Sequence, residues 1–176
     1  MRLVTADERN RMVAACQREA LHLEMRDSYH IPDEAARLAT FRATGQRDSR
    51  HNSAERTQWL AMVRDLAKAG KRLRRARIVS EPVSDYIRYE WAGTHENIAA
   101  GEEVRWLPRR LASAIALPGN DFWLIDGQTA VFTVFAASGE VSERQLTDDA
   151  DVVGLCQRAF EAVWSVALPH ESYRPR

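Results

Sequence analysis

The sequence has no long apolar run, no net charge and only two cysteines. No segment approaches the roughly 18 to 20 apolar residues that cross a bilayer, and residues 1–8 lack the apolar core of a secretion signal. We therefore expect a soluble, cytoplasmic protein that does not bind membranes. Cys16 and Cys156 stand far apart in the chain, which argues against a zinc cluster or a redox pair and predicts buried free thiols.

Motifs of catalysis and cofactor binding are missing as well. The chain contains no P-loop, no dinucleotide-binding glycine fingerprint and no Gly-x-Ser-x-Gly elbow. Its five histidines have no metal-ligand spacing. On a strand, His22 and Glu24 would share one face as in a zinc deaminase, but the cysteine pair of that motif is absent. We expect no metal ion and no cofactor, and nothing supports catalysis.

The composition is that of an ordinary globular domain. Of the 176 residues, 45% are apolar and 28% are charged, which is enough apolar surface to bury a core. We expect a single domain over residues 1–176. Within it, residues 1–52 are predicted to form an N-terminal helical and strand extension, and residues 53–168 the α/β core.

Apolar periodicity indicates helices and strands in alternation. Helix, Gly70 and strand in succession form the αβ half of a crossover unit, so the predicted fold is α/β, with a mixed, mostly parallel sheet flanked by helices. Helices are expected over 7–18, 32–43, 53–69, 80–93 and 148–168, strands over 20–25, 73–80, 103–107 and 141–146, a loop over 44–52, and a fraying tail over 170–176.

The strongest local pattern is a β-hairpin at residues 121–135. Asp126-Gly127 separates two apolar runs rich in β-forming residues, and glycine accepts the positive φ that a tight hairpin turn requires. The segment predicts two adjacent antiparallel strands.

This hairpin resembles part of the phospholipase D-like hydrolases and nucleases. Their pattern has a nucleophilic His, a phosphate-binding Lys two residues later, and an Asp five residues after the Lys, commonly followed by Gly. Aligned on Asp126-Gly127, it places Gly119 at the His position and Asp121 at the Lys position. The resemblance covers residues 53–168 and implies one half of that fold without its chemistry. The alternative is a stable hairpin with no such relation.

A second resemblance spans almost the whole chain. The runs Leu23–Tyr29, Arg75–Glu90 and Leu117–Gly127 are similar to signature runs of an uncharacterised bacterial family. Its members are small proteins of high-GC bacteria, often encoded beside helix-turn-helix regulators. The resemblance implies a protein partner of that kind and supplies no mechanism.

Polar side chains gather at the predicted end of the strand that precedes Ser80. On a helix, Asp85 shares a face with Arg88 and Tyr89, and ligands favour the carboxyl ends of strands in open α/β sheets. An amphipathic helix with an ion pair would give the same pattern. The residues that we single out as ligand- or partner-binding candidates are Ser80, Asp85, Tyr86, Arg88, Tyr89, Arg105, Asp121, Trp123 and Asp126.

A basic run extends from Lys68 to Arg77 and contains six cations and no acid. Such a run attracts phosphate, and nucleic-acid binding would require it to remain unpaired beside aromatic platforms. Alternating arginines on a strand can instead be neutralised by acids on neighbouring strands. Zero net charge further argues against direct nucleic-acid binding.

Three functions remain open. The leading hypothesis is a non-catalytic regulatory or interaction domain that acts with a helix-turn-helix transcription regulator. The second is a small-ligand or nucleotide sensor with a pocket near Ser80 and the hairpin. The third is an enzyme of unrecognised mechanism, built from Asp126, Asp85 and Arg105. The edge strand after Gly139 also suggests a homodimer.

Overall fold

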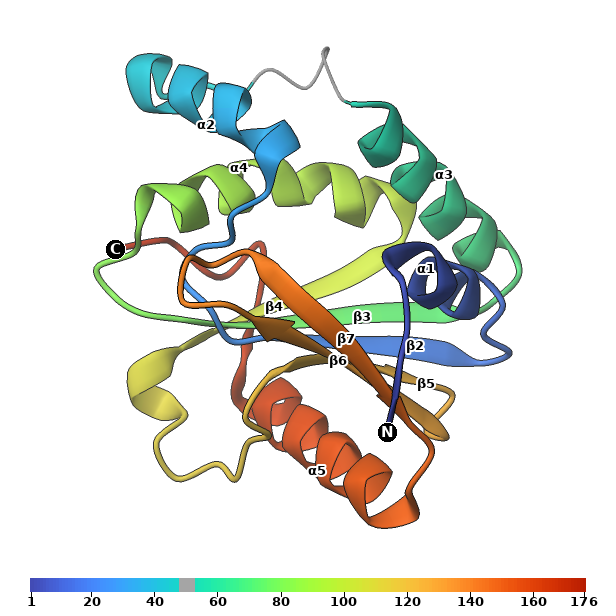
Figure 1. The fold of residues 1–176 in the computed structure, drawn as a ribbon. Coiled ribbons are helices and arrows are strands. Elements are labelled where there is room, and N and C mark those ends of the chain that lie inside the picture. The colour runs from blue at the N-terminus through green and yellow to red at the C-terminus, as the bar shows by residue number, and fades with distance from the viewer. Residues whose placement is uncertain (48–52) are drawn as a thin grey trace.

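The computed structural model describes residues 1–47 and 53–176 (Figure 1), and its strands form one eight-stranded sheet in the order β1-β7-β6-β5-β2-β3-β4-β8. The strands are β1 (Arg2–Leu3), β2 (Glu19–Glu24), β3 (Arg72–Val79), β4 (Glu102–Pro108), β5 (Asp121–Ile125), β6 (Thr129–Phe135), β7 (Val141–Thr147) and β8 (Leu168–Pro169). The helices are α1 (Ala6–Ala14), α2 (Pro32–Thr44), α3 (Ala54–Lys68), α4 (Asp85–Ala100) and α5 (Ala150–Val166), with a 3-10 turn over Arg109–Leu111.

The sheet is mixed, as the sequence predicts, but parallel pairing is confined to its centre. Strands β2, β3 and β4 are parallel to one another, and every other neighbouring pair is antiparallel. The expectation of a mostly parallel sheet therefore holds for three strands only. Residues 1–47 are also not an extension of the core, because β2 lies between β3 and β5 in the middle of the sheet.

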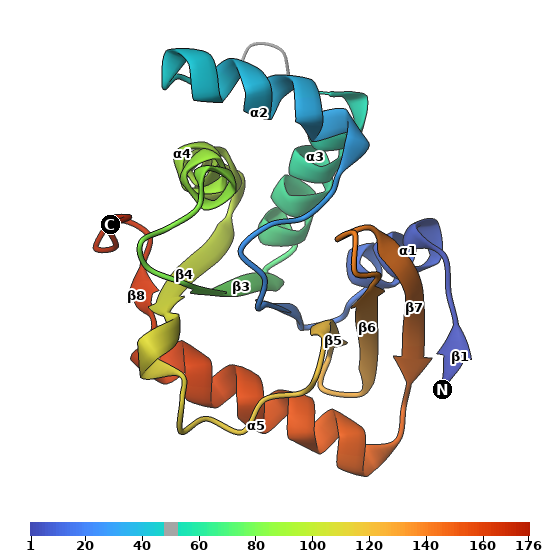
Figure 2. The same cartoon turned by 60° about the vertical axis from the view of Figure 1, so that its left-hand side comes forward.

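The two faces of the sheet are covered differently (Figure 2). Helix α5 alone lies against one face, where its residues Cys156, Phe160 and Val163 pack on apolar side chains of the strands. Helices α1, α3 and α4 lie over the other face, and α2 lies beyond α3 and α4, farther from the sheet. Helix α2 contacts α4 through Phe41 and Tyr89, whose ring centroids are 5.6 Å apart.

The β5–β6 connection is the tight turn that the sequence predicts. Asp126 and Gly127 have φ values of 55° and 66°, the left-handed pair that matches the twist of the flanking strands. The Asp126 carboxylate accepts backbone N–H groups of Gln17, Arg18 and Glu19 at 2.8 to 3.1 Å. Asp126 therefore fastens the hairpin to the start of β2.

Helix ends follow the side chains that cap them. Ser53 caps α3 as predicted. Helix α4, however, begins at Asp85 under the cap of Ser84 rather than at Ser80, and it continues without interruption to Ala100. Two serines of equal capping ability lie four residues apart here, and the sequence pattern could not rank them.

The carboxyl-terminal tail is packed, contrary to the expectation of fraying. Tyr173 is only 2% exposed and stacks on Trp106, with ring centroids 5.6 Å apart. The Val83 N–H donates to the carbonyl oxygen of Arg176 at 2.7 Å. The predicted loop over 44–52 begins after Thr44, and its residues 48–52 lie outside the described part of the chain.

Three further expectations concern cysteines, membranes and the sheet edge. Cys16 and Cys156 are buried free thiols, as predicted. Among the described residues, no helix is long and apolar enough to cross a bilayer. Strand β7 is not fully open as an edge, because Arg2 and Leu3 of β1 pair with its second half.

Candidate functional site

A row of polar side chains crosses the sheet on the face opposite α5. Side chains point alternately to the two faces of a strand. Leu23 and the apolar residues beside it on neighbouring strands point toward α5, and the residues before and after them along each strand point to the other face. The register then puts Arg77 of β3 beside Glu24 of β2, and Thr133 of β6 between Asp121 of β5 and Arg144 of β7. Asp121 lies beside Glu24 in this row, because the two residues occupy the next position along their strands after the Leu23–Phe122 pair.

Buried ion pairs connect the middle of this face. Glu24 accepts from Arg75 at 2.7 Å and pairs with Arg77 at 2.9 Å. Arg77 also donates to Glu90 of α4 at 2.6 Å, and Arg75 to Glu102 of β4 at 2.7 Å. A buried charge is tolerated only when it is paired and hydrogen-bonded, and each arginine here has two carboxylate partners.

The same environment sets the ionisation of the buried groups. Burial opposes the charged form of Arg77, but Glu24 and Glu90 outweigh it and raise the pKa of its guanidinium. Burial likewise opposes ionisation of Glu90, yet Arg77 and Arg47 lower the pKa of this carboxyl. Burial, followed by the positive charge of Arg75, holds the pKa of His22 well below its ordinary value, so the ring is neutral.

A cavity of about 700 Å³ opens over this face. Its floor is the sheet, its walls come from α1, α2, α3 and α4, and its rim is the segment after β2 together with the β6–β7 turn. Ile31 and Val141 on the rim are 43% and 39% exposed, so the cavity reaches solvent there. The lining residues used below are Arg9, His22, Glu24, Glu34, Trp59, Arg75, Arg77, Tyr86, Glu90, Asp121, Trp123 and Arg144.

Aromatic rings form part of the wall. The His22 ring stacks on Trp123 with centroids 4.0 Å apart and planes inclined by 15°. Trp59 of α3 meets Trp123 edge-on at 5.6 Å. Planar apolar surface beside charged groups is typical of small-molecule sites, where rings bury ligand area and a few polar groups fix orientation.

One carboxyl in the cavity has a raised pKa. Asp121 is 3% exposed, and its oxygens accept from the Tyr29 hydroxyl and, at 2.8 Å, from the Met25 N–H. Burial raises the pKa of Asp121 to about 6 despite these bonds, and the charge of Glu24 adds to the rise. Asp121 therefore exchanges its proton near physiological pH.

Several polar atoms around the cavity have no hydrogen-bond partner among the described residues. They are Nδ1 of His22, Nε of Arg77, Nε1 of Trp123 and Nε of Arg144. A buried donor without a partner costs about 1 to 3 kcal/mol, so an unusual concentration of such atoms in one place indicates a site rather than a structural core.

The structure brings together three of the residues predicted from the sequence. Tyr86, Asp121 and Trp123 all line the cavity. Asp85 and Arg88 instead line a second groove, where Asp85 pairs with Arg42 at 3.3 Å.

The remaining predicted residues lie elsewhere. Tyr89 is buried under the guanidinium of Arg47, whose Cζ is 3.9 Å from the ring centroid. Arg105 donates to the backbone oxygen of Trp164 at 2.9 Å, on the α5 side of the sheet. Asp126 holds the hairpin turn at the opposite end of β2, as described above.

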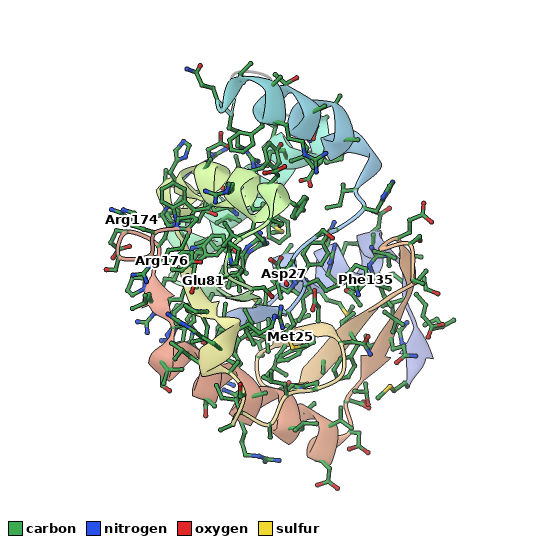
Figure 3. The ribbon with its side chains drawn as sticks, turned by 90° about the vertical axis from the view of Figure 1, so that its left-hand side faces the viewer. Met25, Asp27, Glu81, Phe135, Arg174 and Arg176 are labelled. Carbon is green, nitrogen blue, oxygen red and sulfur yellow. The ribbon has the colours of Figure 1, made fainter. Side chains whose placement is uncertain are left out.

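Ser80 is enclosed in a hydrogen-bonded cluster. Its N–H and hydroxyl donate to the Asp27 carboxylate at 2.7 and 2.6 Å, and Arg109 donates to its hydroxyl oxygen at 2.9 Å. Figure 3 shows Asp27 between Phe135, on the side of β6, and Glu81, toward the tail. Because the polar groups of Ser80 are already satisfied, this residue holds two strand ends together and is not a free ligand contact.

Sequence reasoning missed most of the cavity. Arg9, Glu34 and Arg144 lie on α1, α2 and β7, and nothing in their local patterns marks them. A signal did exist in the strands. The patterns His22-x-Glu24 and Arg75-x-Arg77 place charged or polar side chains on one face of two strands, and alternation alone indicates such a polar floor.

The basic run is neutralised, which is the alternative that the sequence left open. Arg74 pairs with Glu19 at 2.7 Å, and Arg75 and Arg77 are paired as described above. Arg72 also reaches Glu19, at 3.2 Å. These four arginines of the run therefore do not form an unpaired surface for phosphate.

Comparison with solved structures agrees with the expected fold. The chain is similar to Nuc from Salmonella typhimurium, a phospholipase D family member, with a TM-score of 0.53 and 10% identity, over 93% of this chain and 87% of that one. It is also similar to NucT from Helicobacter pylori, with a TM-score of 0.52 and 8% identity, over 96% of each chain. The fold is thus α/β and phospholipase D-like. No curated protein sequence matches significantly.

The structure shows the surroundings of the two residues that the resemblance places at the nucleophilic His and the phosphate-binding Lys. Asp121 is the buried carboxyl of the cavity, and Gly119 lies in the loop before β5, where an added Cβ would meet no atom within 4 Å. Glycine at that position is therefore not enforced by crowding.

A family model matches residues 7–175, and the chain accordingly belongs to the family described as Domain of unknown function (DUF6879).

Proposed function

We propose that this protein is a non-catalytic sensor domain that binds a small ligand in the cavity between the polar sheet face and helices α1 to α4. The observation that carries the proposal is the cavity itself: about 700 Å³, walled by Trp59 and the His22–Trp123 stack and bordered by ionised side chains. Pockets of roughly 300 to 1,000 Å³ with a few convergent polar groups are the usual form of small-molecule sites.

The arrangement of the cavity argues against catalysis. The third hypothesis required Asp126, Asp85 and Arg105 to converge, and these residues lie on a turn, at a helix start and on the α5 side of the sheet. His22 is neutral and stacked, and Glu24 is committed to two arginines. Among the described residues, no cluster of three metal-ligating side chains is present.

Thermal-shift screening of the full chain against nucleotides and acidic metabolites tests the proposal. A ligand at 100 times its dissociation constant adds about 2.7 kcal/mol to the free energy of unfolding, which raises Tm by several degrees. Trp59→Ala is expected to abolish the shift, whereas Trp91→Ala, which removes a half-buried tryptophan outside the cavity, leaves it intact. A flat response across the library would reject the sensor role.

A helix-turn-helix regulator remains the proposed protein partner. The support is the family resemblance described for the sequence, and a ligand sensor needs an effector to which binding is transmitted. Pull-down from the native host, followed by mass spectrometry, checks this part separately. If no regulator is recovered under conditions that preserve known complexes, the partnership fails while the ligand site stands.

A further inference from the structure

Two cations that line the cavity form no direct ion pair with any described carboxylate. Arg9 of α1 and Arg144 of β7 take part in none of the ion pairs within 4.0 Å among the described residues. Arg9 donates through Nε to the neighbouring Asn10 side chain at 2.9 Å. Burial, then repulsion from Arg144 and Arg75, lowers the pKa of Arg9 to about 10.

The chemistry of this part of the cavity is that of an anion site. Two unpaired guanidinium groups that line the same cavity can both be stabilised by an oxyanion that reaches them, since carboxylate and phosphate oxygens match the planar donor fork of arginine. The unsatisfied Nε of Arg144 supplies a donor for such a bond. In contrast, each arginine of the sheet centre, Arg75 and Arg77, already pairs with two carboxylates.

The opposite end is acidic. Glu34 of α2 accepts from the Tyr86 hydroxyl at 3.0 Å and takes part in no ion pair among the residues described. Burial, then the charge of Glu90, raises the pKa of Glu34. The charges of Arg47 and Arg77 lower this pKa only from beyond ion-pair distance, so a ligand nitrogen that carries a positive charge would give Glu34 a direct ionic partner.

The register of the sheet keeps the two ends apart. Glu34 accepts from Tyr86 of α4, and Glu90 of the same helix pairs with Arg77 of β3, whereas Arg144 belongs to β7. Strands β2, β5 and β6 lie between β3 and β7, so these two strands are four strand spacings, or roughly 19 Å, apart along the sheet. Trp59 and the His22–Trp123 stack lie in the same cavity as both ends.

We propose that the cavity binds an elongated planar molecule that carries an oxyanion at the Arg9–Arg144 end and a basic nitrogen at the Glu34 end, with its ring against Trp59 and Trp123. This inference rests on the proposed ligand-binding function and narrows it to one ligand class. A ligand with an anion alone would leave Glu34 without a direct ionic partner, and a cation alone would leave the two arginines without one.

Calorimetric titration of the full chain with matched probes tests the inference. The probes are 4-(aminomethyl)benzoate, which has both charges, 4-methylbenzoate, which lacks the cation, benzylamine, which lacks the anion, and 4-(aminomethyl)phenylphosphonate, which replaces the carboxylate. The doubly charged probes are expected to bind at least about tenfold more tightly than either singly charged one. Of the two doubly charged probes, the one that binds more tightly shows whether the site prefers a carboxylate or a phosphonate.

Variants at the two ends separate the contacts. Arg144→Gln is expected to weaken binding of all three probes that carry an oxyanion by about tenfold and to leave benzylamine unchanged. Glu34→Gln is expected to weaken benzylamine and the doubly charged probes and to spare 4-methylbenzoate. Arg2→Gln and Glu103→Gln, at exposed positions outside the cavity, serve as matched controls.

Two results would overturn the inference. One is equal loss of all probes in both variants while near-UV circular dichroism shows that both remain folded, which would mean that the two ends do not make separate contacts. The other is no binding of any probe although the library screen yields a ligand that Trp59→Ala abolishes. In that case the sensor function stands and the assigned ligand class is wrong, whereas failure of both experiments rejects the function itself.

Discussion

Glu24 shows how much of this molecule depends on single charged side chains inside the fold. It is 8% exposed and pairs with Arg75 and Arg77, which in turn bind Glu102 and Glu90. Such a network costs desolvation energy, and apolar residues of the same size would often serve stability equally well. Its presence beside a cavity agrees with a face shaped for a ligand.

Replacing Glu24 with Gln tests the cost of breaking this network. The variant leaves two buried guanidinium groups short of a carboxylate, so the free energy of unfolding should fall by about 3 kcal/mol. Urea denaturation monitored by tryptophan fluorescence measures the change. Glu103→Gln on the exposed side of β4 should shift stability by less than about 0.5 kcal/mol. A neutral Glu24→Gln would show that the arginines find other partners.

Asp121 makes stability depend on pH. Its folded pKa of about 6 lies above the ordinary value of 3.8, so its contribution is fully present below pH 3.8 and is lost as pH rises through 6. Asp121→Asn removes this loss. The stability of the variant relative to wild type should therefore increase by roughly 2 to 3 kcal/mol between about pH 4 and pH 7.

Urea unfolding across that pH range checks the expectation, with the exposed Asp148→Asn as the control. The difference between Asp121→Asn and wild type should grow with pH, while Asp148→Asn follows wild type throughout. A pH-independent difference would mean that Asp121 ionises normally in the folded state.

At the scale of elements, connections between distant segments hold the cavity in shape. The β5–β6 turn is attached to β2 through Asp126, and the tail covers the far edge of the sheet through Tyr173. Strand β8 pairs with β4, where Leu168 lies opposite Trp106. The tail therefore belongs to the structural core, although its polar composition resembles a free end.

Tyr173→Ala tests the role of the tail. Removing this buried ring leaves a void against Trp106 and Val83, and the free energy of unfolding should fall by about 3 kcal/mol. Differential scanning calorimetry measures the loss as a lower Tm. The neighbouring Glu171→Ala, at an exposed position, is the control. Equal Tm values for the two variants would mean that the tail is not part of the core.

At the scale of the whole molecule, the phospholipase D-like fold is kept while the positions that the resemblance assigns to its nucleophile and phosphate-binding lysine hold Gly119 and Asp121. A glycine cannot form a phosphoenzyme, and a carboxylate repels a phosphodiester. The polar face is filled instead with paired arginines and glutamates. In the function that we propose, the same sheet supports a binding cavity in place of a reaction centre.

We expect no hydrolysis of bis(p-nitrophenyl) phosphate by the purified chain above the buffer background. Gly119→His alone should not restore activity, because Asp121 still opposes phosphate binding. Release of p-nitrophenolate is the measurement, with an active phospholipase D-like nuclease as the positive control. Turnover by the wild-type chain that Asp121→Asn abolishes would show that a different catalytic set operates in the cavity.

Local features of this protein were predictable from its sequence because their causes lie within a few residues. The Asp126-Gly127 turn follows from the positive φ that its geometry requires, and the start of α3 follows from the capping hydroxyl of Ser53. The position of His22 and Glu24 on the same face of a strand was likewise predictable from the sequence. The absence of the His and Lys of the phospholipase D-like pattern could be seen directly from the residue types in the sequence.

What only the tertiary structure decided is which distant residues meet. The central place of β2, the packing of Tyr173 and the choice of Ser84 over Ser80 as a cap depend on competing long-range contacts. The cavity joins side chains from four helices and five strands, so no local pattern can encode it. The sequence alone determined an α/β frame without the His and Lys of the pattern that its hairpin resembles, and packing then decided that the polar face of this frame encloses a cavity.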